Sequence, residues 1–95
     1  MIVGYGRMTF HLHGVRSLKE KRKIVKALIS RLQRQFNASV AEVGDNDVHQ
    51  RAQIGFSLVG NDAGVIDSKM DKFLNMAENL GIAEMTDAET ELMTL

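Results

Sequence analysis

The sequence predicts a small α+β domain whose elements follow one another in the order βαββαβ. Three observations support this fold class. Apolar and polar residues alternate in residues 2–13 and 51–58, which is the period of half-buried strands. Apolar residues recur at spacings of three and four after Ser17 and after Asp62, which is the period of amphipathic helices. Two further short segments, 38–43 and 88–93, have the composition and length of strands.

The first predicted strand, residues 2–13, has one apolar face and one mostly polar face. The apolar face is formed by four large side chains: Ile2, Met8, Phe10 and Leu12. Gly4 and Gly6 fall on the same face. Their missing side chains predict a bend or the close approach of a helix. The short turn at residues 14–16 then leads into the first helix.

The first predicted helix begins at a capping box. Ser17 can accept a hydrogen bond from an amide of the first turn, and Glu20 can reach back to the Ser17 amide. The apolar side of this helix consists of Leu18, Val25, Leu28, Ile29, Leu32 and Phe36. The opposite side carries Lys19, Lys23, Lys26 and Arg34. The helix should end near Asn37, because Asn tolerates the left-handed conformation found at helix ends.

The rest of the chain predicts a hairpin, a second helix and a last strand. The turn at residues 44–47 joins segment 38–43, whose buried face the pattern leaves open, to the strand 51–58. Asp62 caps a helix that Gly81 ends, and the last strand has acids at alternate positions. This order is that of the ferredoxin-like sandwich, a four-stranded antiparallel sheet with two helices on one face. We expect a single ferredoxin-like domain over residues 1–95.

Composition excludes several classes of protein. The chain has no cysteine, which excludes a disulfide framework and thiolate metal sites. Its apolar runs are shorter than the ~18 residues that a membrane-spanning helix needs. Residues 1–14 alternate and carry charge, unlike a signal peptide. We therefore expect a soluble cytoplasmic protein without a membrane partner.

The net charge of zero is the sum of two unlike halves. Residues 1–41 carry nine Lys or Arg side chains and one acid, a formal charge of +8. Residues 42–95 carry three bases and eleven acids, a formal charge of −8. This separation could direct a polyanion to one side of the molecule, or the two halves could neutralise each other in the folded state.

The start of the first helix is the first candidate site. Six cations gather here: Arg16, Lys19, Lys21, Arg22, Lys23 and Lys26. Phosphate would be attracted by these charges and by the positive end of the helix dipole. Cations at this end oppose the dipole, so that a bound anion would stabilise the arrangement. The alternative is a solvated helix face without a ligand.

The sheet face that the helices leave uncovered is the second candidate. Alternation assigns to it the side chains of Tyr5, Arg7, His11, His13, Arg51, Gln53 and Ser57. Tyr5 is the one aromatic residue among them, so the base stacking used by RNA-recognition domains is not expected. The face could instead bind a protein or pair two copies of the chain as a homodimer.

Metal and phosphate chemistry have only partial signatures. His11 and His13 point the same way on their strand, and a divalent metal would need further ligands from His49, Asp45, Asp47 or Glu42. The segment 45–47 resembles the start of a calcium loop whose glycine and closing glutamate are missing. The loop at 14–16 lies where acylphosphatases hold phosphate, without their longer glycine-rich signature. We therefore expect no metal, no cofactor and no catalytic residue, and an acylphosphatase-like enzyme is the least favoured interpretation.

Several motifs together resemble the YlxP-like family of small bacterial proteins. These motifs are Ser17-Leu18-Lys19-Glu20-Lys21-Arg22, Phe36-Asn37-Ala38-Ser39-Val40-Ala41-Glu42-Val43, Gln50-Arg51-Ala52 and Asn61-Asp62. The resemblance covers nearly the whole chain, with departures at Ala38, where a β-branched residue is usual, and in the acidic last strand. It implies a ferredoxin-like fold and a cytosolic bacterial protein. It also implies genes that neighbour those of translation initiation and ribosome maturation factors.

The YlxP-like family has no characterised activity, so the resemblance assigns no site residue. Charge pattern and resemblance together predict a non-enzymatic accessory factor that binds ribosomal RNA or a ribosomal particle through the six cations. A protein-interaction or homo-oligomerisation module that uses the open sheet face is the alternative.

Overall fold

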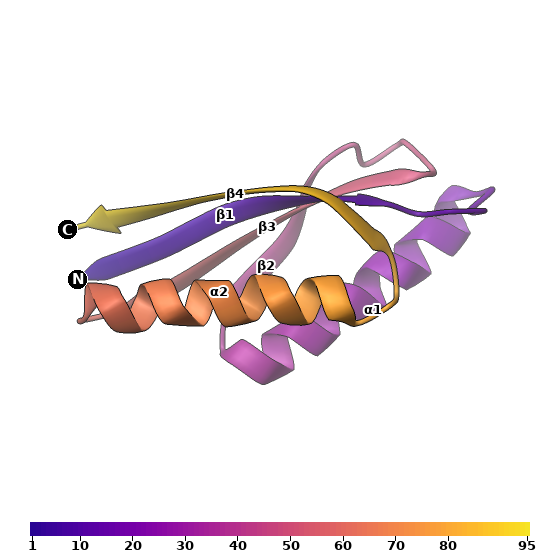
Figure 1. The fold of residues 1–95 in the computed structure, drawn as a ribbon. Helices are drawn as coiled ribbons and strands as arrows, with labels where there is room; N and C mark the ends of the chain where they lie inside the picture. Colours follow the sequence, from indigo (N-terminus) through magenta and orange to yellow (C-terminus); the bar gives the residue numbers. More distant parts are fainter.

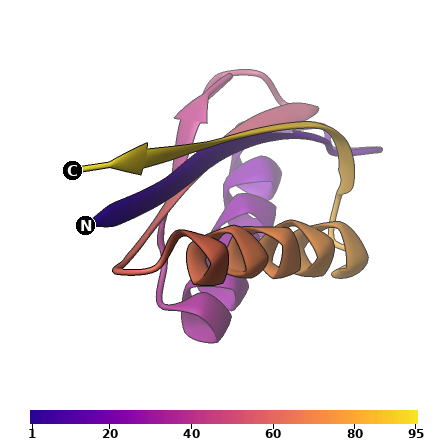
Figure 2. The ribbon, with the colours of Figure 1, turned by 60° about the vertical axis from the view of Figure 1, so that its left-hand side comes forward.

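The computed structural model describes all residues, 1–95, and has the predicted order of elements. The elements are β1 (Ile2–His11), α1 (Leu18–Phe36), β2 (Ser39–Gly44), β3 (Arg51–Gly60), α2 (Ala63–Asn79) and β4 (Glu84–Thr94). The strands form one antiparallel sheet in the order β2-β3-β1-β4. Both helices cover the same face of this sheet (Figure 1, Figure 2). The ferredoxin-like α+β fold is thereby confirmed.

Helix α1 begins and ends at the signals that the sequence carries. The Ser17 hydroxyl oxygen accepts a hydrogen bond from the Glu20 amide at 3.1 Å, as in a capping box. The Glu20 carboxylate, however, accepts a hydrogen bond from the Arg16 amide at 3.1 Å and not from the Ser17 amide. The predicted partner of Glu20 was therefore wrong by one residue. Asn37 adopts the left-handed conformation, with φ 49°, and its amide donates to the Gln33 carbonyl.

The core lies between the sheet and the two helices. Sixteen buried apolar residues from all the elements except β4 form one cluster. The ring of Phe73 on α2 stacks on Phe56 of β3 at a centroid distance of 4.3 Å and meets Phe36 of α1 edge-on at 5.3 Å. Val40 is the buried residue of β2, which decides the face that the sequence left open.

Gly4 permits the close approach of a helix that the sequence predicted. A Cβ atom at Gly4 would lie 2.6 Å from Ile66 and 2.8 Å from Met70, both on α2. At Gly6 it would lie 2.4 Å from the Glu89 carbonyl oxygen in β4 and 2.9 Å from the Phe56 ring. The two glycines therefore bring both α2 and the neighbouring strands close to β1.

Strand β4 is longer than predicted. It runs over Glu84–Thr94 instead of residues 88–93 and pairs with β1 along its whole length, from Ile2 opposite Thr94 to His11 opposite Glu84. Every residue of β4 except the half-buried Met85 is exposed, so its sequence has no apolar alternation to reveal its true start. The two ends of the chain meet where the Leu95 amide donates to the Met1 carbonyl at 2.8 Å. Neither helix is both long and apolar enough to cross a membrane.

Candidate nucleic-acid interface and open sheet face

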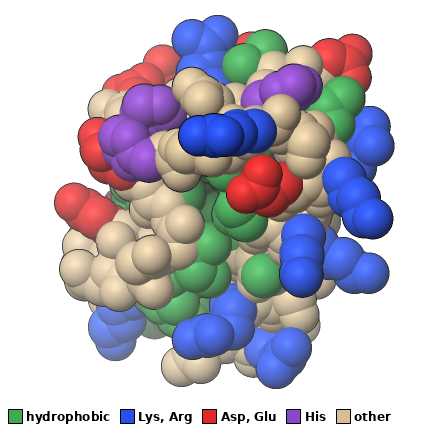
Figure 3. All heavy atoms as spheres, turned by 90° about the vertical axis from the view of Figure 1, so that its right-hand side faces the viewer, with side chains coloured by type: hydrophobic (Ala, Val, Ile, Leu, Met, Phe, Trp, Pro, Cys, Tyr) green, Lys and Arg blue, Asp and Glu red, His purple; other side chains and the backbone are tan.

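Helix α1 presents a row of cations to solvent. Lys19, Arg22, Lys23 and Lys26 are spaced by three, four and seven residues, which places them on one side of the helix. All four are exposed, as is Arg16 just before the cap. None of these five side chains has a carboxylate within the 4.0 Å limit of an ion pair. We call Arg16, Lys19, Arg22, Lys23 and Lys26 the cationic stripe. Figure 3 looks onto the end of the molecule where α1 begins, and many Lys and Arg side chains lie around its margin.

Lys21, which the sequence analysis placed among these cations, does not belong to them. Its side chain is 1% exposed, and its ammonium group lies 3.0 Å from Glu42 Oε2 on β2. The same ammonium donates to the backbone carbonyl of Asp45. Lys21 occupies the apolar side of α1, four and seven residues before Val25 and Leu28, which are both buried. Its charge therefore faces the β2–β3 hairpin and is not available to a ligand in solvent.

Two residues that the sequence analysis assigned to the open sheet face form hydrogen bonds within the β2–β3 hairpin. Arg51 donates to the Asp45 carboxylate through Nε at 2.8 Å and Nη2 at 3.2 Å, and Gln53 donates to it at 2.8 Å. These bonds, that of Arg51 foremost, hold the pKa of the Asp45 carboxyl below its ordinary value of 3.8. Arg51 and Gln53 thus stabilise the hairpin end, so a ligand would have to compete with Asp45 for them.

The loop before α1 is poorly suited to phosphate hydrolysis. Val15 is buried, and the Arg16 amide already donates to the Glu20 carboxylate at 3.1 Å. An acyl phosphate in this loop would meet that negative charge beside an occupied amide. A phosphate group bound at this end of α1 would meet the exposed side chains of the cationic stripe.

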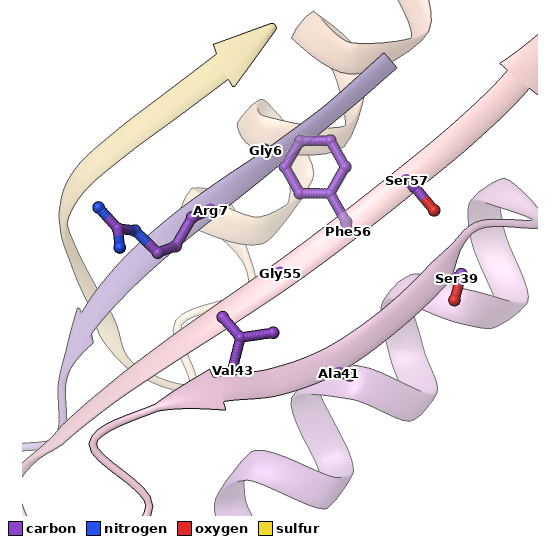
Figure 4. Close-up of a pocket in the computed structure, with 8 residues that line it drawn as sticks. All are labelled: Gly6, Arg7, Ser39, Ala41, Val43, Gly55, Phe56 and Ser57. Atoms are coloured by element: carbon purple, nitrogen blue, oxygen red, sulfur yellow. The ribbon is translucent and has the colours of Figure 1, made fainter. Parts of the chain in front are cut away.

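The open sheet face has a shallow depression of about 330 Å³ over β1, β2 and β3. Its floor is made of small residues: Ser39, Ala41, Gly55 and Ser57. Figure 4 shows the Arg7 guanidinium turned away from this depression toward β4, where it lies 3.3 Å from the Glu89 carboxylate. Tyr5 and Val43 project from the same face and are 42% and 56% exposed. The depression is shallow and widely open, so it would enclose little of the surface of a small molecule.

His11 and His13 meet a partner that the sequence analysis did not name. Glu84, at the start of β4, places Oε2 2.7 Å from His13 Nε2, and the two imidazole centroids lie 4.0 Å apart. The hydrogen bond with His13 is the main cause that lowers the pKa of Glu84 from its ordinary value of 4.5. The structure groups the two histidines with Glu84 and not with His49, Asp45, Asp47 or Glu42. The sequence analysis did not place Glu84 beside the histidines, because it predicted that the last strand begins at residue 88.

Comparison with known proteins confirms the family. A curated relative, the uncharacterised protein YlxP of Bacillus subtilis, is 28% identical over 90 residues, covering 95% of this chain and 98% of that protein. Similar solved structures include a VAO-type flavoprotein of Myceliophthora thermophila, with TM-score 0.57 and 18% identity over 98% of this chain. This chain spans only 16% of that flavoprotein. The structural-genomics protein YJCS has TM-score 0.53 and 10% identity, covering 97% of this chain and 99% of its own.

These two structural likenesses support the fold alone. The resemblance seen in the motifs at Ser17 and Phe36 is confirmed along the sequence, since the profile of one family matches residues 3–90. The chain therefore belongs to the DUF503 family, which is described as a protein of unknown function, and the B. subtilis protein YlxP is a relative of this chain.

Proposed function

We propose that this protein is a non-enzymatic accessory factor that binds the phosphate backbone of a structured RNA, such as ribosomal RNA within a ribosomal particle. The observation that carries the proposal is the cationic stripe: four exposed cations along one side of α1 and Arg16 just before its cap, none of them with an acidic partner. Unpaired cations in a row attract a polyanion and release its condensed counterions on contact. Such a factor would act in the cytoplasm, which agrees with a chain that has no cysteine.

The proposed contact is to phosphate and not to bases. Tyr5 is the one aromatic residue on the open sheet face, and Gly55 and Ser57 on β3 offer no ring on which a base could stack. A row of cationic side chains along one side of a helix, in contrast, can contact successive phosphates along a groove of folded RNA. The protein should therefore recognise the shape of the RNA and its charge rather than its sequence.

A salt series with two matched double variants tests this proposal. Binding to ribosomal RNA is measured for the wild type, for Lys19→Ala with Lys23→Ala, and for Lys69→Ala with Lys72→Ala. Each double variant removes two exposed helix lysines and lowers the net charge by the same amount. If the stripe contacts phosphate, the α1 variant should reduce the slope of log K against log salt by about 1.5, at ~0.7 to 0.9 per lost contact. The α2 variant should leave the slope nearly unchanged.

Two outcomes would contradict the proposal. One is the absence of RNA binding at low salt. The other is an equal loss of slope in both double variants, which would mean that net charge and not the position of the lysines governs binding. Circular dichroism of each variant provides the control for folding, since the substituted side chains are exposed and should leave the helices intact.

The open sheet face supports a second proposal, self-association or binding of a protein. Its depression of about 330 Å³ has a floor of small residues, between the exposed side chains of Tyr5 and Val43. A flat face with protruding apolar groups and a small-residue floor can accept side chains of a partner. A homodimer through this face should weaken when Gly55→Arg fills the depression, as measured by sedimentation equilibrium. A wild-type protein that stays monomeric at high concentration would contradict the homodimer.

A further inference from the structure

Three donor groups converge at the end of the sheet, next to the start of α1. They are the imidazoles of His11 and His13 and the carboxylate of Glu84, and one ligand atom from each lies within 4.8 Å of the others. His11 is half-buried, whereas His13 and Glu84 have side chains that are 63% and 58% exposed. The group is therefore open to solvent and to an ion, while His11 is fixed by the sheet.

The sheet is irregular at this point in a way that creates the group. Between Thr9 and Phe10 the pairing of β1 with β4 shifts: Thr9 lies opposite Asp87, Phe10 opposite Met85, and His11 opposite Glu84. One extra residue of β4 is inserted there, as in a β-bulge. Without it Met85 would lie opposite His11. The bulge instead puts Glu84 beside His11 and packs Met85 against the core. Bulges often redirect side chains next to binding sites.

The cation nearest along the sheet is already paired. Arg51 lies opposite His11 on the other side of β1, where its charge would repel a metal ion. Its guanidinium makes two hydrogen bonds to the Asp45 carboxylate, at 2.8 and 3.2 Å. This pairing turns Arg51 toward the hairpin and offsets its charge. The two histidines therefore have the Glu84 carboxylate on one side and the Arg51–Asp45 ion pair on the other.

We propose that His11, His13 and Glu84 form a binding site for a divalent transition metal of the zinc class. Two imidazole nitrogens and one carboxylate oxygen are the ligand set that Zn²⁺ accepts in sites that keep a fourth position for water or substrate. With bonds of ~2.1 Å, tetrahedral ligand atoms lie about 3.4 Å apart. The observed separations, from 2.7 Å between His13 and Glu84 to at most 4.8 Å, reach this value by small rotations of exposed side chains.

Zinc titration of the metal-free protein tests the site. Isothermal titration calorimetry should give one Zn²⁺ per chain for the wild type. His13→Gln and Glu84→Gln should each weaken binding at least tenfold, because each removes one of three ligands. The matched control is His49→Gln, which changes the third histidine of the chain, in the exposed hairpin turn outside the group. This variant should bind Zn²⁺ with unchanged affinity.

A second measurement keeps the test independent of the variants. Zinc should shift the NMR signals of the His11 and His13 rings and leave those of His49 in place. The proposal is overturned if no saturable binding occurs up to 1 mM Zn²⁺, or if His49→Gln weakens binding as much as the ligand variants do. It is also overturned if Glu84→Gln binds like the wild type, which would leave Glu84 as a hydrogen-bond partner of His13 only. None of these changes touches the cationic stripe, so the result is separate from RNA binding.

Discussion

Lys19 and Lys21 are two positions apart on α1, but the charge of Lys19 is exposed to solvent and that of Lys21 is buried. Lys19 is exposed and has no carboxylate partner, whereas Lys21 is 1% exposed and lies against Glu42 and the Asp45 carbonyl. The 3.6-residue turn of the helix places one on the outer side and the other on the side that packs on the sheet. Lysine at position 21 thus joins the start of α1 to the end of β2.

Replacing Lys21 by Ala should destabilise the protein by about 3 kcal/mol, which is the low end of the range for a broken buried ion pair. We choose the low end because the Glu42 side chain keeps 18% exposure and can be partly hydrated. The free energy of unfolding, measured in urea, checks this value. Lys19→Ala is the matched control and should change it by less than about 0.5 kcal/mol.

A comparison of two further variants separates charge from packing. If the cost of Lys21→Ala comes from the unpaired Glu42 carboxylate, Lys21→Met with Glu42→Gln should recover most of the lost stability. If Lys21→Ala and Lys19→Ala are equally mild, the buried pair does not contribute to folding, and our account of Lys21 is wrong.

The environment of Lys21 could be predicted from the sequence, whereas that of Glu84 could not. Lys21 lies on the apolar side of α1 with Val25 and Leu28, and this helical position already separates it from the outward-facing lysines. Glu84 reaches His13 only because of a bulge in the pairing of β4 with β1. A register shift of this kind depends on contacts distant in the chain, and no local pattern encodes it.

Strands β1 and β4 are held together by backbone hydrogen bonds more than by contacts between apolar side chains. All residues of β4 but Met85 are exposed, so the strand gains little from burial and depends on its hydrogen-bond ladder to β1. Gly6 permits this ladder, because a Cβ atom there would lie 2.4 Å from the Glu89 carbonyl oxygen, which is part of the backbone and cannot rotate away.

Gly6→Ala should therefore destabilise the protein by about 1 to 3 kcal/mol, the usual cost of an overpacked site. Hydrogen exchange should show the effect as faster exchange of β4 amides. The control is Gly64→Ala in the first turn of α2, where a Cβ atom would lie 3.4 Å from Asp62 Oδ1. This change should stabilise by about 0.5 kcal/mol, since Ala is the better helix former. Unaltered protection of β4 in Gly6→Ala would contradict the proposed role of Gly6.

The elements differ in how far their sequences predict them. Helix α1 has both a cap and an apolar stripe, and its end at Asn37 was predicted correctly. Strand β3 has clean alternation because its one face is buried. Strand β4 has neither signal, because it is an edge strand with almost all its residues exposed and its partner is at the far end of the sequence. Pairing to a distant strand, and not local preference, determines where β4 begins.

The separation of charge along the sequence persists in the folded molecule. Helix α1 packs against β2, whereas α2 packs against β1, β3 and β4, so that most acids lie on the α2 and β4 side of the sheet. Of the cations at the start of α1, only Lys21 forms an ion pair, and it does so with Glu42 of the neighbouring strand. The acids of α2 and β4 therefore do not cover the cationic stripe. By this charge distribution, a polyanion that approaches the molecule would be attracted to α1 and repelled by the α2 and β4 side.

If the protein binds RNA as proposed, the acidic side should affect the rate of association and not the number of phosphates contacted. Asp67→Asn, Asp71→Asn and Glu91→Gln remove three exposed carboxylates that form no ion pair and lie far from the stripe in sequence. Weaker repulsion in the triple variant should raise the association rate ~3- to 10-fold at low salt, measured by stopped flow. The slope of log K against log salt should change by less than about 0.5, since it reflects mainly the cations in contact with phosphate. A slope that grows by one unit or more would mean that RNA also touches the α2 and β4 side, so that binding would not be confined to α1.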